Sequence, residues 1–192
     1  DGKVFVSNIY DVPADVDTST GDIKFPGSVF VHGNVITGFS VEAEGDIVVD
    51  GVVEGARLKA GGQIVLKRGI QGMGRGILEA KGNIITKFIE NATVRSGGYV
   101  ATEAIMHSKV AADGDVTASG RRGFVVGGEI RSGTSISVRT AGSTMGTATV
   151  LEIGADAEHM EEYRKVSERL PELEAELEKV TQTCSTLTRR ML

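Results

Sequence analysis

Aliphatic residues recur along this chain at intervals that suit stacked coils of β-strand. In the early part they fall six residues apart, at Ile23, Val29, Val35, Val41, Ile47 and Val53. Because side chains of a strand alternate between its two faces, this spacing keeps these residues on one face while the chain turns a corner between them. Three corners close a coil, and stacked coils bury an interior that one coil cannot enclose. The pattern predicts an all-β fold, a parallel β-helix (solenoid).

The same pattern continues in longer units. Seven aliphatic residues open successive units with steps of 18, 17, 20, 16, 16 and 20 residues: Val29, Ile47, Ile64, Ile84, Val100, Val116 and Ile136. A second set of large residues, flanked by small ones, precedes the next opening residue by six: Leu58, Leu78, Val94, Val110 and Ile130. We expect two stacked columns of large side chains, in which each buried aliphatic contributes about 1.5–3 kcal/mol.

Corners and length variation give the remaining signals within the repeat. A glycine followed by a polar residue precedes most inward aliphatics, and we expect these polar residues to face solvent. The two units of 20 residues carry glycine-rich expansions at 68–76 and 120–128. We expect both expansions on one side of the coil, where solenoids place binding loops. The candidate partner-binding residues are therefore Arg68, Gln71, Met73, Arg75, Arg121 and Arg122.

Three segments are expected: a lead-in strand and linker (1–20, with the strand at 4–6), the solenoid (21–154) and a C-terminal α-helical coiled-coil segment (155–192). Residues 155–192 contain no glycine, and their apolar residues alternate steps of three and four. This heptad seam comprises Tyr163, Val166, Leu170, Leu173, Leu177, Val180, Cys184, Leu187 and Met191. Pro171 predicts a kink or a restart of the helix. A single such helix needs a partner for its seam: a return helix, the solenoid or another copy.

Composition narrows the classes of function. Only 5% of the 192 residues are aromatic and Trp is absent, which suits a thin aliphatic interior. A net charge of -5, with Lys and Arg scattered among acidic residues, argues against a nucleic-acid partner. The single cysteine agrees with a reducing compartment, so we expect a cytoplasmic protein. No apolar run approaches the roughly 20 residues of a membrane span, and we expect no direct membrane insertion. Because Asp1 stands in place of an initiator Met, we expect a piece of a longer protein.

Residue patterns that could carry chemistry have simpler interpretations here. The glycine-rich stretch 69–76 lacks the spacing of a phosphate-binding loop, and we expect a corner loop. The three histidines lack metal-ligand spacing, and Ser108, beside His107, belongs to an inward column. Asp113 and Asp115 are best interpreted as solvated turn carboxylates. We therefore expect no catalytic site, no cofactor and no metal.

Four phrases together resemble the flagellar assembly protein A family: 21–29 (GDIKFPGSV), 51–56 (GVVEGA), 87–92 (KFIENA) and 142–147 (GSTMGT). The resemblance covers nearly the whole chain. It implies a right-handed parallel β-helix, a coiled-coil extension, a separate N-terminal domain, no known enzymatic activity and a link to flagellar placement or assembly. Residues 45–98 are also similar to the C-terminal β-helix of the cell-division inhibitor MinC and more loosely to bactofilin, both of which point to assembly scaffolds.

The leading hypothesis is a non-enzymatic scaffold that self-associates as a homodimer or higher oligomer. Open solenoid ends and the helical seam motivate it, because uncovered strand edges invite pairing. Another protein of the flagellar or polar machinery is a candidate partner. One alternative is a protein-binding adaptor that uses the two glycine-rich expansions, or a module like the cell-division inhibitor. The other is a β-helix acyltransferase or polysaccharide-active enzyme, which the steps of 16 and 20 residues disfavour because a left-handed hexapeptide helix needs uniform coils of 18.

Overall fold

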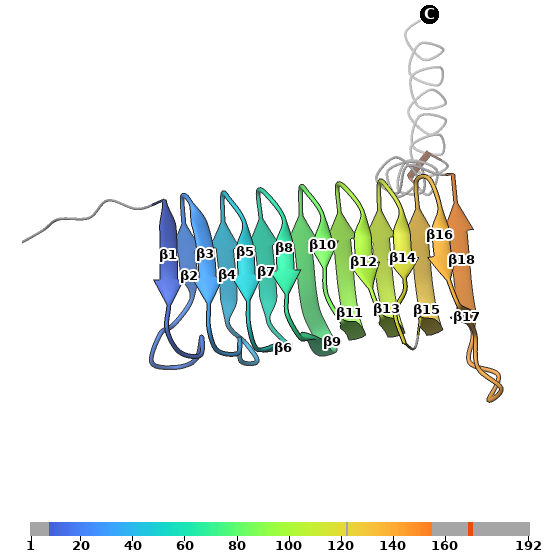
Figure 1. Ribbon diagram of the computed structural model, residues 1–192, viewed down its shortest axis with the longest axis horizontal. Coiled ribbons are helices and arrows are strands. Elements are labelled where there is room, and N and C mark those ends of the chain that lie inside the picture. Colours follow the sequence, from blue (N-terminus) through green and yellow to red (C-terminus); the bar gives the residue numbers. More distant parts are fainter. Residues whose placement is uncertain (1–7, 122, 155–168, 171–192) are drawn as a thin grey trace, which may run out of the picture. The chain divides into compact units, whose positions relative to one another are not determined.

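The computed structural model describes residues 8–121, 123–154, 169 and 170. Up to residue 154 these form an all-β parallel solenoid, as predicted (Figure 1). An eight-stranded parallel sheet forms what we call the first face, with one strand from each coil. In spatial order its strands are β1 (Ile9–Val12), β3 (Ser28–Val31), β5 (Ile47–Val49), β8 (Ile64–Leu66), β10 (Ile84–Ile85), β12 (Val100–Thr102), β14 (Val116–Ala118) and β16 (Ile136–Val138).

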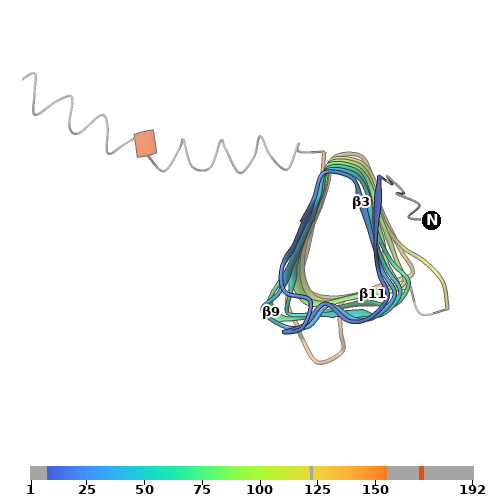
Figure 2. The same ribbon diagram turned by 90° about the vertical axis from the view of Figure 1, so that its left-hand side faces the viewer.

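A ten-stranded sheet forms the other two faces, so that the cross-section is triangular (Figure 2). Its main path is β2 (Ile23–Phe25), β4 (Ser40–Ala43), β7 (Arg57–Ala60), β9 (Gly69–Ala80), β11 (Phe88–Ser96), β13 (Ala104–Ala112), β15 (Phe124–Ser132) and β17 (Thr140–Ala141). In addition, β6 (Val52–Glu54) pairs with β9, and β18 (Thr149–Ile153) pairs with β15. The long strands β9, β11, β13 and β15 bend around a corner. Their first halves, with β6 and β17, form the second face, and their second halves, with β2, β4, β7 and β18, form the third face.

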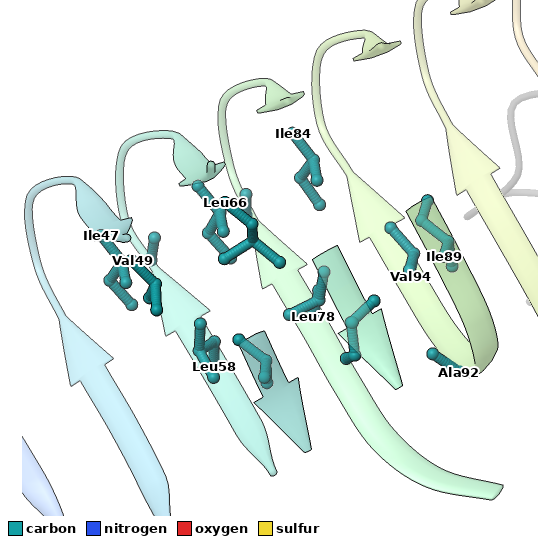
Figure 3. Close-up of a cluster of buried hydrophobic side chains, with 14 of the residues drawn as sticks. Ile47, Val49, Leu58, Leu66, Leu78, Ile84, Ile89, Ala92 and Val94 are labelled. Carbon is teal, nitrogen blue, oxygen red and sulfur yellow. The ribbon is translucent and has the colours of Figure 1, made fainter. Parts of the chain in front are cut away.

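Strand register stacks the two sets of aliphatic residues that the repeat singled out. On the first face Ile47 pairs with Ile64, and the file continues through Ile84, Val100, Val116 and Ile136. On the third face Leu58 pairs with Leu78, and the file continues through Val94, Val110 and Ile130. All of these residues and Val29 are buried except Ile136, which is half-buried because it lies on the last strand of the first face (Figure 3).

A third column lies on the second face, whereas two columns were predicted. It contains Val16, Val35, Val53, Ile70, Ile89, Ile105 and Val125, all fully buried. In the later coils its members precede the third-face column by five residues, as in Ile89 to Val94. An odd spacing puts two side chains of a regular strand on opposite faces. Here one residue with left-handed backbone takes up the extra position, as Asn91 and His107 do, each with φ 47°.

The polar residues after the corner glycines join one coil to the next, which is more than the solvent-facing role expected of them. The Oδ1 atom of Asn34 accepts a hydrogen bond from the Val52 amide at 2.8 Å, and Asp46 Oδ1 accepts one from the Gln63 amide at 2.8 Å. An inward serine serves another corner, because the Ser132 hydroxyl donates to the Gly114 carbonyl at 2.7 Å. Backbone amides and carbonyls at the corners that have no partner in a β-sheet therefore form hydrogen bonds with side chains.

The solenoid begins at Ile9 and not at Gly21 as expected. Strand β1 pairs in parallel with β3, and both Val12 and Val16 are buried in the core. The strand predicted at 4–6 lies outside the described residues. Of the predicted coiled-coil seam only Leu170 is described; it has helical backbone and is exposed. The coiled coil and the right-handed sense of the solenoid stay predictions.

Candidate functional site

The two glycine-rich expansions lie at different corners, so the prediction that they share one side of the coil is wrong (Figure 2). The first is a bulge between the second and third faces, where Gln71 and Gly76 pair with Glu90 and Ala92. It belongs to strand β9 and is not a separate corner loop. The second expansion was predicted at 120–128; its extra residues are 119–123, between the first and second faces, since Ala118 pairs with Thr102 and Phe124 with Ala104. The extra residues of the two units lie at two different corners. The length of a unit alone does not show at which corner its extra residues lie.

The candidate partner residues on these expansions are therefore not brought together. At the first expansion Arg68, Gln71, Met73 and Arg75 are exposed, and Met73 adopts a left-handed backbone with φ 51°. At the second, Arg121 is exposed and Arg122 lies outside the described residues. Two separate corners present these side chains, and they do not form one binding surface.

A groove on the outside of the second face has the features of a binding site. Phe88 and Phe124 each pair with Ala104, one on either side of it. Strand alternation turns all three outward, because the next residue of each strand belongs to the buried third column. Ala104 is nonetheless only 6% exposed and forms the floor between the two rings. The groove has a volume of about 380 Å³ and is lined by Gln71, Lys87, Phe88, Glu90, Glu103, Ala104, Met106 and Phe124.

Gly69 explains why this groove is open above Ala104. Phe88 has Gly69 as its register neighbour on one side and Ala104 on the other. A Cβ atom on Gly69 would lie 2.6 Å from Cδ1 of the Phe88 ring and 2.6 Å from the Phe88 carbonyl oxygen. The ring therefore occupies the space over Gly69, and the space over Ala104 stays open.

The rim of the groove carries more negative than positive charge. Glu90 and Glu103 contribute two carboxylates and Lys87 one ammonium group, and none of the three forms an ion pair among the described residues. Aromatic walls beside carboxylates suit a side chain that is both apolar and cationic, because a cation is attracted to the ring faces as well as to the carboxylates.

Sequence reasoning missed this groove, although a signal was present. Phe88 and Phe124 each directly precede a large aliphatic residue, Ile89 and Val125. Had the third column been recognised, alternation would have turned both phenylalanines outward on neighbouring coils, with Ala104 between them.

Polar groups that sequence analysis weighed for chemistry hold the coils together. The buried Ser108 hydroxyl donates to the Met106 carbonyl at 2.7 Å and accepts from the Ala92 amide at 3.1 Å. The Asp115 carboxylate accepts hydrogen bonds from the Ser135 and Thr134 hydroxyls at 2.6 Å each, and these bonds lower the pKa of Asp115. Within 8–121, 123–154 and 169–170, no three His, Cys, Asp or Glu side chains are grouped closely enough to hold a metal ion.

The two ends of the solenoid are the remaining surfaces where strands lack a neighbouring coil. At the N-terminal end the rings of Tyr10 and Phe25 pack together across the mouth, with centroids 5.6 Å apart. At the C-terminal end the inward-facing residues Leu151 and Ile153 of β18 are 41% and 55% exposed. Their register neighbours in the preceding coil, Ile130 and Ser132, are fully buried. The last coil thus exposes to solvent the inward-facing side chains that the inner coils bury.

Comparison with known proteins identifies one family. The model of the flagellar assembly protein A β-solenoid domain matches residues 8–191. No curated protein and no solved structure matches the chain significantly. Among the described residues, no helix has the length and apolar character needed to cross a membrane.

Proposed function

Because the chain belongs to the flagellar assembly protein A β-solenoid family, we propose that it is a non-enzymatic, self-associating scaffold of flagellar assembly or polar organisation in the bacterial cytoplasm. The family supports a structural or assembly role. The observation that carries self-association is the exposed interior of the last coil, at Leu151 and Ile153. Apolar surface and unpaired strand edges at one place are typical of a surface that another chain covers.

Sedimentation equilibrium of the full chain tests this function. We expect a dimer or higher oligomer at micromolar concentration, with a mass that falls on dilution. A monomer that persists at high micromolar concentration would overturn self-association, and with it the scaffold.

The groove favours a second candidate function, that of a protein-binding adaptor. Phe88 and Phe124 offer apolar walls, and Glu90 and Glu103 offer uncompensated carboxylates. The partner segment that fits carries an aromatic or aliphatic side chain next to a lysine or arginine. This adaptor would use neither glycine-rich expansion as its main surface.

A defined probe tests the adaptor function. A phenylalanyl-lysine amide titrated into the isotope-labelled chain should shift NMR signals around Ala104, and Phe124→Ala should abolish these shifts. Phe30→Ala is the matched control, because Phe30 is also turned outward but lies on the first face. Shifts that survive Phe124→Ala, or that Phe30→Ala removes equally, would exclude the groove as the binding site.

A further inference from the structure

We propose that two copies of this chain associate through the C-terminal ends of their solenoids, around a two-fold axis, and so form a closed dimer and not a filament. The inference rests on the proposed self-association and says which surface carries it. The two ends of the solenoid differ in chemistry, and this difference favours contact through the C-terminal end.

Among the described residues, the edge strands of the C-terminal end lack lysine and proline, two of the features that normally protect a sheet edge. Strands β16 (Ile-Ser-Val) and β18 (Thr-Val-Leu-Glu-Ile) contain no lysine and no proline. The Gly154 amide donates to the Ser132 carbonyl, so alternation points the amides and carbonyls of Leu151 and Ile153 away from β15, towards the open end. Backbone groups ready to pair therefore lie beside exposed apolar side chains.

The N-terminal end is protected by several such features. Val12, Val16 and Ile23 are buried at this end, and the Tyr10 and Phe25 rings pack against each other, although Tyr10 itself is 43% exposed. Pro13 directly follows β1 and Pro26 directly follows β2. Lys24, at the centre of β2, has an 86% exposed side chain. Lysine and proline on edge strands are recognised defences against pairing with another chain.

The difference between the two ends determines which symmetry we expect in the complex. Stacking a C-terminal end on an N-terminal end would repeat without limit and build a filament. It would require the protected end as acceptor. Contact between two C-terminal ends uses the same surface on both copies, closes after two chains and runs the paired strands antiparallel.

Charges at the C-terminal end fit this arrangement. In an antiparallel pairing of two β18 strands centred on Leu151, the two Leu151 residues face each other and Glu152 faces Val150 of the second copy. The two Glu152 carboxylates thus avoid each other, and each keeps its own partner, Arg131 Nε, at 2.9 Å. A lysine at position 151 would be tolerated in a monomer, where its ammonium group reaches water. In the dimer it would oppose an identical charge in an apolar contact.

The test compares one substitution at each end of the full chain by sedimentation equilibrium and amide hydrogen exchange. Leu151→Lys should weaken dimerisation by about tenfold or more. Tyr10→Lys is the matched control, because Tyr10 is 43% exposed and also faces the interior at an end; it should leave the dimer intact. In the wild-type dimer the Leu151 and Ile153 amides should exchange slowly and become fast on dilution. Unchanged exchange of core amides, such as that of Val110, verifies that Leu151→Lys still folds.

Each of the other outcomes would overturn a specific part of the proposal: the interface, the end that is used, the closure of the dimer or self-association itself. A dimer that survives Leu151→Lys removes this interface but leaves self-association intact. A dimer lost through Tyr10→Lys alone would assign the contact to the opposite end. A series of ever larger species would contradict closure. A wild-type monomer would overturn both proposals, and slow exchange at Leu151 in that monomer would show that the chain's own residues after Gly154 cover the end.

Discussion

The left-handed residue at the corner between the second and third faces gives the sharpest test of the fold. His107 has φ 47° within β13 and lies between the buried residues Ile105 and Val110. A side chain in this conformation costs about 1–2 kcal/mol, and glycine avoids that cost. Glycine elsewhere in a strand costs about 0.5–1 kcal/mol relative to alanine. We therefore expect His107→Gly to be more stable than His107→Ala by about 0.5–1 kcal/mol.

Comparing glycine with alanine at one position isolates the backbone effect. Both variants lose the imidazole ring, which packs over Gly127, so that contact cancels. Lys109 is the matched control, because it is exposed on the same strand and is not among the positive-φ residues. There the order should reverse, with Lys109→Gly less stable than Lys109→Ala by about 0.5–1 kcal/mol. Urea unfolding followed by circular dichroism measures the four free energies. His107→Ala as stable as His107→Gly, or more stable, would refute the left-handed backbone at 107.

Three further predictions test the core, the groove and the corners. Leu78→Ala should cost about 2–5 kcal/mol of unfolding free energy, whereas the neighbouring Glu79→Ala should change it by about 0.5 kcal/mol or less, as urea titration will show. Gly69→Ala should cost about 1–3 kcal/mol and displace the Phe88 ring, which a shift of the Ala104 methyl signal in NMR spectra would report; an unchanged spectrum would contradict the packing of that ring on Gly69. Because the pKa of Asp115 is lowered from its ordinary value of 3.8, its carboxylate stabilises the fold at pH values above 3.8. This contribution is lost as the pH falls below 3.8. The melting temperatures of wild type and Asp115→Asn should accordingly converge below that pH, and a constant difference would contradict the role assigned to this carboxylate.

The fold class could be predicted from the sequence because the strand register between coils produces a regular spacing of aliphatic residues. Aliphatic residues such as Leu58, Leu78 and Val94 must stack, and a slip by one residue would turn them outward. The spacing within one coil is a weaker guide once a left-handed residue intervenes. Val35 and Val53 each follow the preceding first-face residue, Val29 or Ile47, by six residues, as a strand pattern predicts. Ile89 precedes Val94 by five residues, and this odd step hides the third column in the sequence.

The candidate site was harder to predict because it depends on neighbours across coils. Glycine content identified the expansions, but only strand pairing shows which corner each one occupies. The groove needs Phe88, Ala104 and Phe124 in register, and these residues lie on three different coils. The solenoid start was missed because Pro13 and the polar residues after it look like a linker, although Val16 is buried.

Native-state thiol labelling tests the central claim, that three columns share one interior, most directly. In a Cys184→Ser background, Ile89→Cys and Val94→Cys should both react with a maleimide only as fast as the protein unfolds. Thr93→Cys, which is outward and exposed on the same strand, should react at once. Fast labelling at either 89 or 94 would place these residues on opposite faces, as a regular strand would, and would contradict the account.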